Sequence, residues 1–277
     1  YNLPVPTTWA QFADVAAKLH KANPKIAIAN FWPEDANFLF SMMGQNGSVP
    51  FNWGGGKDIS INLTCASCIQ FANYWQKLIS AGEVTTVPDN AAQEFGLLDT
   101  GLVASVPRAA WGPKYLASAA TNTLGDWRVA KLPQWSVGTN VTPMWGGSSY
   151  TVTQQSAHKK QAAEFVQWFT TSQASWKIVS GAPSFEFPSD TTTLHSKRFL
   201  GQQIPLTGKQ KVEQNFASAA TTLKPINWPP FMTYVSNAVL DEFAKVVQHD
   251  ETMGQALQAL QKTLVSYATR EGFTVRQ

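Results

Sequence analysis

Residues 95–106 read Phe-Gly-Leu-Leu-Asp-Thr-Gly-Leu-Val-Ala-Ser-Val, and the run Pro-Arg-Ala-Ala-Trp follows at 107–111. This order predicts a glycine turn, a short strand of small residues over 102–106 and a helix over 112–120, with Trp111 at the corner between strand and helix. Such a corner holds one flat aromatic ring at the edge of a cleft. Because loops on a rigid scaffold carry binding residues disproportionately, Trp111 is the first candidate for contact with a ligand.

The segments on either side of this corner alternate between strand and helix patterns. Thr8 and Gln11 form a capping box that opens an N-terminal helix, which Asn23-Pro24 ends. Strands are predicted at 26–31, 102–106, 127–132 and 148–153, and further helices at 36–43, 65–81, 112–120, 157–171, 174–180, 190–200, 208–220, 230–248 and 252–269. Strands alternating with helices predict an α/β fold with layered sheets.

Composition excludes some classes of function. Charged residues make up 14% of the 277 residues and the net charge is only +3. A nucleic-acid-binding protein would show clustered Lys and Arg, so no nucleic-acid partner is expected. No stretch approaches the eighteen or so apolar residues of a membrane span.

The chain contains 11 tryptophans, an unusual number for its length. Most are expected in the core. Trp32, Trp53, Trp111, Trp145 and Trp228, however, stand beside Pro or Gly in predicted loops. A flat apolar ring with a polar edge suits the CH face of a pyranose, so these five are candidate stacking residues.

Four charged residues lie near these aromatic positions. Glu34, Asp35 and Glu186 are loop carboxylates, which could accept hydrogen bonds from sugar hydroxyls. Two carboxylates are also what glycoside hydrolysis requires, and the sequence gives no distances to separate the two roles. Arg108 precedes Trp111 and could hydrogen-bond an oxygen-rich ligand or form an ion pair on the helix surface.

Cys65 and Cys68 are the only cysteines. A C-x-x-C at a helix start permits a local disulfide in an oxidising compartment, two free thiols or a redox-active pair. A single cysteine pair without a nearby histidine does not complete a zinc site, so no metal is expected. No catalytic residues and no cofactor are predicted.

Five motifs, in this order, resemble extracellular solute-binding proteins of bacterial ABC importers, the maltose-binding-protein-like class. They are the helix start at 3–12, the run at 125–133, Trp-Gly-Gly with the strand at 144–152, the helix at 159–169 and the C-terminal helix start at 253–257. The resemblance covers essentially the whole chain. It implies a type II periplasmic-binding-protein-like fold, in which two lobes are joined by hinge strands. The Thr-Trp helix start lies much earlier here than in the family, so we expect the first lobe to be incomplete, lacking about a hundred residues.

The resemblance implies an organisation and a function. Residues 1–132 would form mostly the second lobe, residues 133–188 the hinge strands and a remnant of the first lobe, and residues 189–277 helices packed mainly on the second lobe. A sugar or oligosaccharide would be captured between the lobes by hinge closure and delivered to the permease subunits of an ABC transporter. The protein would be extracytoplasmic, either periplasmic or lipid-anchored at the outer face of the cytoplasmic membrane, not an enzyme, and a monomer once the missing segment is supplied.

The family carries a sugar-stacking tryptophan at the position of Trp111. Trp145, followed by Gly146 and Gly147, would face it from the other lobe, with Trp32, Glu34, Asp35, Trp53, Arg108, Trp228 and Glu186 as further ligand-binding candidates. Residues 182–186 depart from the family pattern. Three other functions remain open: a binding protein for a phosphorylated polyol such as glycerol phosphate, a glycoside-processing enzyme, and a remnant that binds no ligand.

Overall fold

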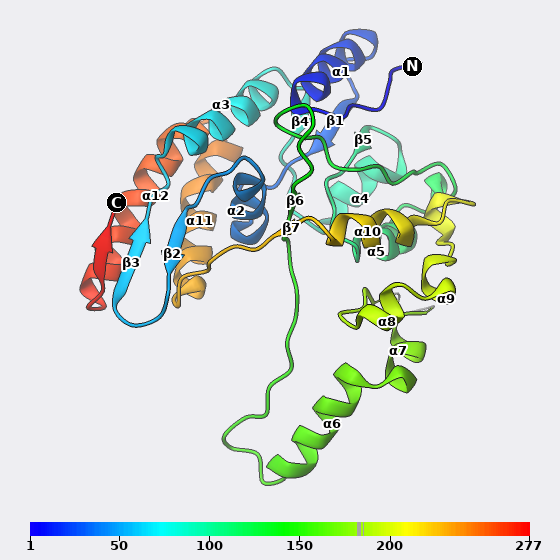
Figure 1. The fold of residues 1–277 in the computed structure, drawn as a ribbon. Helices are drawn as coiled ribbons and strands as arrows, with labels where there is room; N and C mark the ends of the chain where they lie inside the picture. Colours follow the sequence, from blue (N-terminus) through cyan, green and yellow to red (C-terminus); the bar gives the residue numbers. More distant parts are fainter. Residues whose placement is uncertain (182–183, 185) are drawn as a thin grey trace. The chain divides into compact units, whose positions relative to one another are not determined.

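The computed structural model describes residues 1–181, 184 and 186–277, and the chain divides into two compact units (Figure 1). Unit 1 comprises Tyr1–Pro107, Leu132–Trp145 and Thr222–Gln277, and unit 2 comprises Arg108–Lys131 and Gly146–Thr221. Each unit is therefore assembled from segments that are far apart in the sequence.

The division into units differs from the three consecutive segments expected from the sequence. Residues 108–131 group with residues 146–221, and not with the N-terminal part of the chain. The last helices of the chain do belong to the same unit as residues 1–107. How these units correspond to the lobes of the family fold stays a prediction.

A short parallel sheet lies in the core of unit 1. Its central strand β1 (Ala27–Asn30) pairs with β4 (Val84–Thr85) on one side and β5 (Val103–Ser105) on the other. All four residues of β1 are buried, as expected of an apolar strand covered on both faces. Helix α1 (Trp9–Ala22) packs against β1 and begins at the capping box of Thr8.

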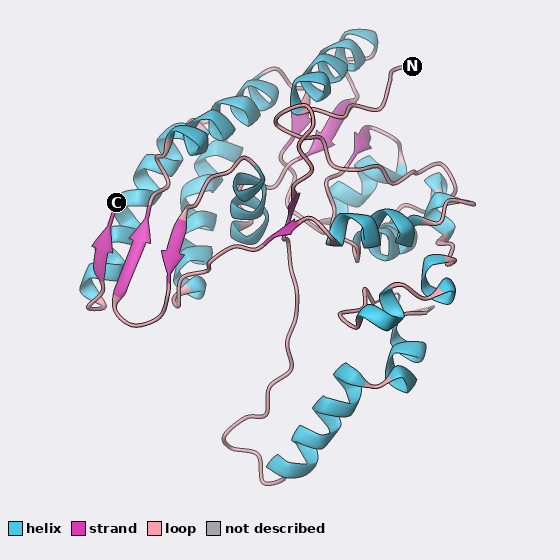
Figure 2. Ribbon diagram, in the orientation of Figure 1, coloured by secondary structure: helices cyan, strands magenta, loops and turns pink. Residues whose placement is uncertain are grey.

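The other elements of unit 1 form a second mixed sheet, a strand pair and a helical layer (Figure 2). They are α2 (Ala36–Gln45), β2 (Phe51–Trp53), β3 (Asp58–Ile61), α3 (Ala66–Ser80), α4 (Ala92–Asp99), β6 (Thr142–Pro143), β7 (Leu223–Lys224), α11 (Met232–Val247), α12 (Met253–Arg270) and β8 (Thr274–Arg276). Strand β3 lies between β2 and β8. The main hydrophobic core cluster draws its buried residues from unit 1 alone.

Unit 2 has a different composition of elements. In its described residues these are all helical: α5 (Gly112–Ala119), η1 (Thr121–Thr123), α6 (Lys159–Thr171), α7 (Gln173–Val179), α8 (Thr191–Leu194), α9 (Lys197–Leu200), η2 (Pro205–Thr207) and α10 (Val212–Ala220). Figure 2 shows the same absence of strands from the described part of this unit. Helix α6 contains no buried residue.

Most predicted helices are confirmed, with the end of α3 marked by Gly82 at a positive φ of 70°. Three predictions were wrong in detail. The segments 127–132 and 148–153, predicted as strands, form no strand, because no neighbouring strand pairs with them. The helix predicted at 190–200 is broken into α8 and α9. Helix α4 was not predicted, because Gly96 suggested a turn within it.

Candidate functional site

An open groove of about 670 Å³ lies in unit 1 between two segments distant in sequence. It is lined by Trp53, Gly54, Gly55, Pro225, Ile226, Asn227 and Trp228. Both tryptophans were candidates from the sequence, and the structure brings them together. Their neighbours were missed, because proximity across the fold leaves no local signal in the sequence.

Local structure fixes the groove walls. Trp53 ends β2, and its indole Nε1 donates to the carbonyl oxygen of Gly56 at 3.1 Å. Gly55 and Gly56 have φ values of 98° and 69°, a left-handed backbone that favours glycine, so the turn stays narrow beside the ring. On the opposite wall, Asn227 Nδ2 donates to Asn52 Oδ1 at 3.3 Å, which links the two segments.

No ionisable side chain lines this groove. Its chemistry is that of two half-buried indole rings, an asparagine amide and glycine backbone. Aromatic faces bind flat apolar surfaces, and amides both donate and accept hydrogen bonds. The groove therefore suits a neutral ligand that is rich in hydroxyl groups.

A second group of candidates lies at the carboxyl end of β1. Trp32 and Trp145 are 5.5 Å apart between ring centroids, and Phe38 packs edge-on to both. Trp32 has no exposed surface, although its proline neighbour suggested an open loop position. Its ring is thus part of the packing beneath Trp145, which is only partly buried.

Asp35 and Glu34, in the loop before α2, differ in their roles. Asp35 is the N-cap of α2, and its Oδ1 accepts from the backbone N–H of Phe38 at 3.0 Å. Glu34 is partly buried, and its Oε2 has no hydrogen-bond partner among the described residues. Burial raises the pKa of Glu34 to about 7, and the nearby carboxylates of Asp35, Asp89 and Glu94 add to the rise, against a backbone hydrogen bond that lowers it.

A polar network beside this loop was not predicted, because its members are distant in the sequence. Asn30, the last residue of β1, donates through Nδ2 to Glu94 Oε1 at 3.0 Å. The other oxygen of Glu94 accepts from the backbone N–H of Asn90 at 2.8 Å. This network joins β1 to α4 and fixes the strand end from which Glu34 follows.

In unit 2, Trp111 lies at the predicted corner, immediately before α5. The guanidinium carbon of Arg108 is 5.6 Å from the Trp111 ring centroid, and Tyr115 packs edge-on to the same ring at 5.5 Å. A Cβ at Gly112 would lie 2.6 Å from Cβ of Arg108, so the corner requires glycine there. A Cβ at Gly146 would lie 3.4 Å from Trp111 Nε1, which places Gly146 beside the indole edge.

Two further candidates occupy different surroundings. Glu186 forms an ion pair with Lys114, with Oε1 and Nζ 2.8 Å apart, and Lys114 also donates to the carbonyl oxygen of Ser184. Gly147 has a φ of 111° and is exposed. The sequence departure at 182–186 lies partly outside the described residues, since 182, 183 and 185 are not among them.

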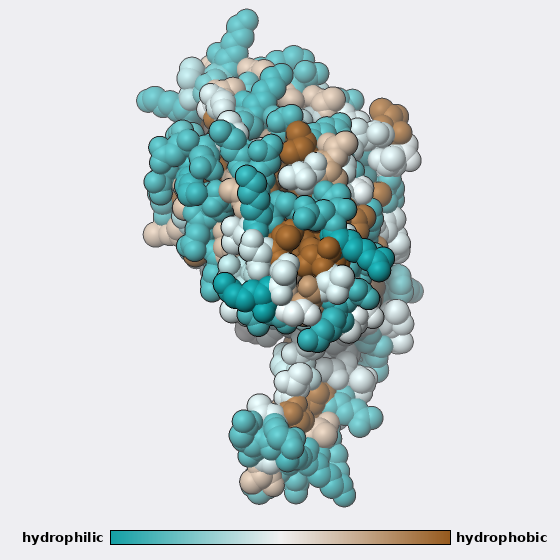
Figure 3. All heavy atoms as spheres, turned by 90° about the vertical axis from the view of Figure 1, so that its left-hand side faces the viewer, coloured by the Kyte–Doolittle hydropathy of each residue, from teal (hydrophilic) through white to brown (hydrophobic). Residues whose placement is uncertain are grey.

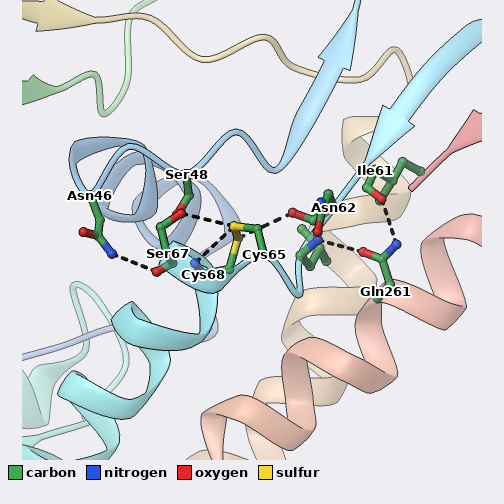
Figure 4. Close-up of a disulfide and its surroundings, with 9 residues drawn as sticks. Asn46, Ser48, Ile61, Asn62, Cys65, Ser67, Cys68 and Gln261 are labelled. Atoms are coloured by element: carbon green, nitrogen blue, oxygen red, sulfur yellow. Dashed lines mark hydrogen bonds between the residues drawn. A yellow bond between two sulfur atoms is a disulfide. The ribbon is translucent and has the colours of Figure 1, made fainter.

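Cys65 and Cys68 form a disulfide at the start of α3, as in the first of the three alternatives left open by the sequence (Figure 4). Cys65 Sγ also accepts from the backbone N–H of Cys68, so it caps the helix. Asn46 Nδ2 donates to the carbonyl oxygen of Ser67 at 2.8 Å and ties this turn to the end of α2. The disulfide therefore lies among contacts that hold the start of α3 and link it to α2.

Among the described residues, no group of three or more His, Cys, Asp or Glu side chains is arranged to hold a metal ion. No helix in the described part of the chain is both long enough and apolar enough to cross a membrane.

Comparison with known proteins identifies the fold. One similar structure is a binding protein associated with an ABC transporter of B. animalis subsp. lactis Bl-04, solved in complex with β-1,6-galactobiose. It is 27% identical to this chain with a TM-score of 0.86, and the match covers 98% of this chain and 68% of that protein's chain. The galacto-N-biose-/lacto-N-biose I-binding protein of Bifidobacterium longum is 21% identical with a TM-score of 0.79, matching 99% and 66% respectively. These neighbours have the type II periplasmic-binding-protein α/β fold, which confirms the predicted fold class.

Among curated proteins, the lactose-binding protein of Rhizobium radiobacter is 25% identical over 246 residues, which are 87% of this chain and 56% of the relative. The chain thus spans little more than half the length of that relative and about two thirds of the two structures. The profile of the family described as bacterial extracellular solute-binding protein matches residues 1–176. The chain belongs to this family.

Proposed function

We propose that this chain is the larger part of the carbohydrate-binding component of an ABC importer, which captures a sugar or oligosaccharide outside the cytoplasm and passes it to a membrane permease. The observation that carries the proposal is the groove of Trp53 and Trp228, which offers two aromatic rings and no ionisable side chain. The relatives bound to galactobiose and lacto-N-biose, and the lactose-binding protein, support the same class of ligand.

Ligand capture needs no bond-making chemistry. Stacking on an indole ring removes the apolar CH face of a sugar from water, and the Asn227 amide can bond its hydroxyls. In the mechanism we propose, Trp145 and Glu34, which lie in the same unit as the groove, add contacts to the ligand, and hinge closure then encloses it. Closure is stabilised only to the extent that the ligand binds the closed form better than the open form.

The groove also weighs against two of the three alternative functions. A phosphorylated polyol needs cationic groups, and no basic side chain lines the groove. Lys114, the lysine nearest the Trp111 corner in sequence, is already paired with Glu186. A glycoside-processing enzyme needs two carboxylates at the bond to be cleaved, and the groove contains none. We therefore propose that the protein is not an enzyme.

The first prediction concerns the two groove tryptophans. Trp53→Ala and Trp228→Ala should each weaken sugar binding about tenfold, because each removes one stacking ring worth roughly 1.5 kcal/mol. Lactose, β-1,6-galactobiose, lacto-N-biose and maltose are titrated by isothermal calorimetry, and the ligand is recovered afterwards by chromatography. Recovery of intact sugar distinguishes capture from hydrolysis.

Tyr1→Ala is the matched control, because Tyr1 is an exposed aromatic residue outside the groove lining. It should leave the dissociation constant unchanged. Equal affinities in wild type and both tryptophan variants would remove the groove from the binding site. Failure of the folded chain to bind any of these sugars would contradict the proposed function for these 277 residues.

A further inference from the structure

A disulfide is also the oxidised state of a redox-active pair, and the two sulfurs of Cys65–Cys68 have different surroundings. Cys65 is partly exposed and stands between the exposed residues Thr64 and Ala66, whereas Cys68 is fully buried. Thiol–disulfide exchange begins when a thiolate attacks one of the two sulfurs, and access decides which one is attacked. An incoming thiolate therefore reaches Cys65, and Cys68 is the leaving group.

Two hydrogen-bond donors face the accessible sulfur. The backbone N–H of Cys68 donates to Cys65 Sγ at 3.1 Å, at the start of α3. The hydroxyl of Ser67 lies 3.2 Å from the same sulfur, and because a disulfide sulfur carries no proton, Ser67 is the donor. Ser67 in turn accepts from Ser48 Oγ at 3.0 Å (Figure 4). Donors at a helix start favour negative charge, so these contacts stabilise a thiolate at Cys65 once the bond is open.

The buried sulfur has a different neighbour. Cys68 Sγ lies 3.5 Å from the carbonyl oxygen of Asn62. In the disulfide, Cys68 Sγ has no proton to donate, whereas the thiol formed on reduction can donate one to that oxygen. Reduction therefore adds a donor at Cys68, while Cys65 keeps both of the donors that face it.

The backbone around the pair is held by contacts that do not involve sulfur. On one side, Gln261 of α12 donates to the carbonyl oxygen of Ile61 and accepts from the N–H of Leu63, both at 2.7 Å (Figure 4). On the other side, Asn46 donates to the carbonyl oxygen of Ser67. The disulfide joins residues only three apart, and so short a loop restrains the unfolded chain little. Opening the bond should therefore leave this turn in place.

The surface near the pair indicates the size of the reactant. Strand β3 leads into the turn that carries Cys65. The side of the molecule on which β3, β8 and α12 lie is mostly hydrophilic, and its hydrophobic atoms gather only in small patches (Figure 3). Protein partners usually dock on larger apolar patches. A low-molecular-weight thiol needs no such surface, so it is the reactant that fits this site.

We propose that Cys65–Cys68 is a reversible thiol–disulfide exchange site for a small thiol, with Cys65 as the residue that forms the mixed disulfide. A thiolate RS⁻ forms a bond to Cys65 Sγ, the bond between the two cysteines breaks, and Cys68 leaves as a thiolate that takes a proton from water. A second RS⁻ attacks the sulfur of the bound thiol, which yields RSSR and releases Cys65 as a thiolate. The pair gains the two electrons that the two thiols lose.

The exchange goes beyond the proposed capture of sugar. Neither cysteine lines the groove of Trp53 and Trp228. Each exchange modifies one chain and turns over no further substrate, so the pair is a site of modification and not of catalysis.

Reduced glutathione in large excess tests the exchange in the folded 277-residue chain at pH 8. Free thiols are trapped by alkylation and counted by mass spectrometry, while circular dichroism follows the helix content. The disulfide should be lost from most molecules with the helix content unchanged. A disulfide that glutathione reduces only after a denaturant has unfolded the chain overturns the proposal, because the bond would then serve the fold alone.

Single-cysteine variants identify the reactive sulfur. Oxidised glutathione is added to Cys68→Ser, which keeps Cys65, and to Cys65→Ser, which keeps the buried Cys68. The first variant should form the mixed disulfide at least tenfold faster, because its thiolate is both accessible and stabilised. Equal rates in the two variants overturn the assignment of Cys65.

The pH profile of this reaction tests the hydroxyl donor. Adding Ser67→Ala to the Cys68→Ser chain should raise the pH of half-maximal rate by about one unit, the effect of losing one hydrogen bond to a charged group. Ser80→Ala is the matched control, because Ser80 lies at the other end of α3 and its Oγ accepts from Gln76. An unchanged profile with Ser67→Ala overturns the role given to Ser67. These reactions need no sugar, so their failure leaves the proposed function untouched.

Discussion

The carboxyl group of Glu34 lacks the hydrogen-bond partners that a buried polar group normally has. It is a partly buried carboxyl whose Oε2 has no described hydrogen-bond partner, and burial raises its pKa to about 7. The charged groups that act on it, Asp35, Asp89 and Glu94, are all acidic and favour its protonated form. A sugar hydroxyl would supply the missing donor, and an ionised carboxylate accepts more strongly than a neutral acid.

Sugar binding is therefore predicted to strengthen as the pH rises from 6 to 8, because Glu34 ionises across this range. The gain should be about fivefold, the difference of roughly 1 kcal/mol between a charged and a neutral hydrogen bond. Glu34→Gln should abolish the pH dependence and match the wild type at pH 6. Calorimetric titrations at pH 6, 7 and 8 measure it; a wild-type affinity that is independent of pH would exclude Glu34 from the ligand contacts.

At the scale of elements, α3 is stabilised both by a local covalent link and by packing against distant parts of the chain. Its start is held by the disulfide Cys65–Cys68, and its buried face by Phe71, Trp75 and Leu78. A disulfide that closes so short a loop restricts the unfolded chain only slightly, at about 2 kcal/mol. The apolar face should therefore keep α3 folded without the covalent link.

Replacing both cysteines by serine is predicted to lower Tm by about 4–8 °C, with no loss of helix content. Serine at position 65 can still cap the helix, so the comparison isolates the covalent link. Thermal unfolding followed by circular dichroism gives the shift, and dithiothreitol should lower the Tm of the wild type but not of the variant. Collapse of the fold in the variant would show that the link does more than restrain the unfolded chain.

Elements whose pattern is local could be predicted from the sequence, and those that depend on a partner could not. The capping box at Thr8 and the apolar stripe of α1 are read within a few residues, and that helix is confirmed. Residues 148–153 have strand-forming residues, but a strand exists only when another pairs with it. The groove illustrates the same limit, because Trp53 and Trp228 meet only through the fold. Trp32 was misjudged because its proline neighbour masked a buried position directly after β1.

At the scale of the whole molecule, the two units differ in how they are stabilised. Unit 1 contains every described sheet and the whole main hydrophobic cluster. Unit 2 has no described strand and leaves Phe165 and Trp168 of α6 exposed. Cooperative two-state unfolding is a property of single cores, and regions with fewer buried apolar contacts open at lower free energy. We therefore expect the 277-residue chain to unfold in two transitions, unit 2 first.

Glu213, buried in α10 of unit 2, allows the lower transition to be assigned. Burial raises its pKa from 4.5 to about 7, so its stabilising contribution is complete below pH 4.5 and is lost as the pH rises through 7. At pH 8, Glu213→Gln should therefore increase the free energy of unfolding of unit 2 by on the order of 2 kcal/mol, which raises the temperature of the lower transition. At pH 4.5 the substitution should leave that temperature unchanged. Glu34→Gln is the control, because the Glu34 carboxyl lies in unit 1. It should raise the temperature of the upper transition at pH 8 and leave it unchanged at pH 4.5.

Differential scanning calorimetry at both pH values resolves the two transitions. A single transition whose temperature is shifted by both variants would mean that the units unfold together. Separate shifts would show that the two units unfold independently, unit 2 at the lower temperature.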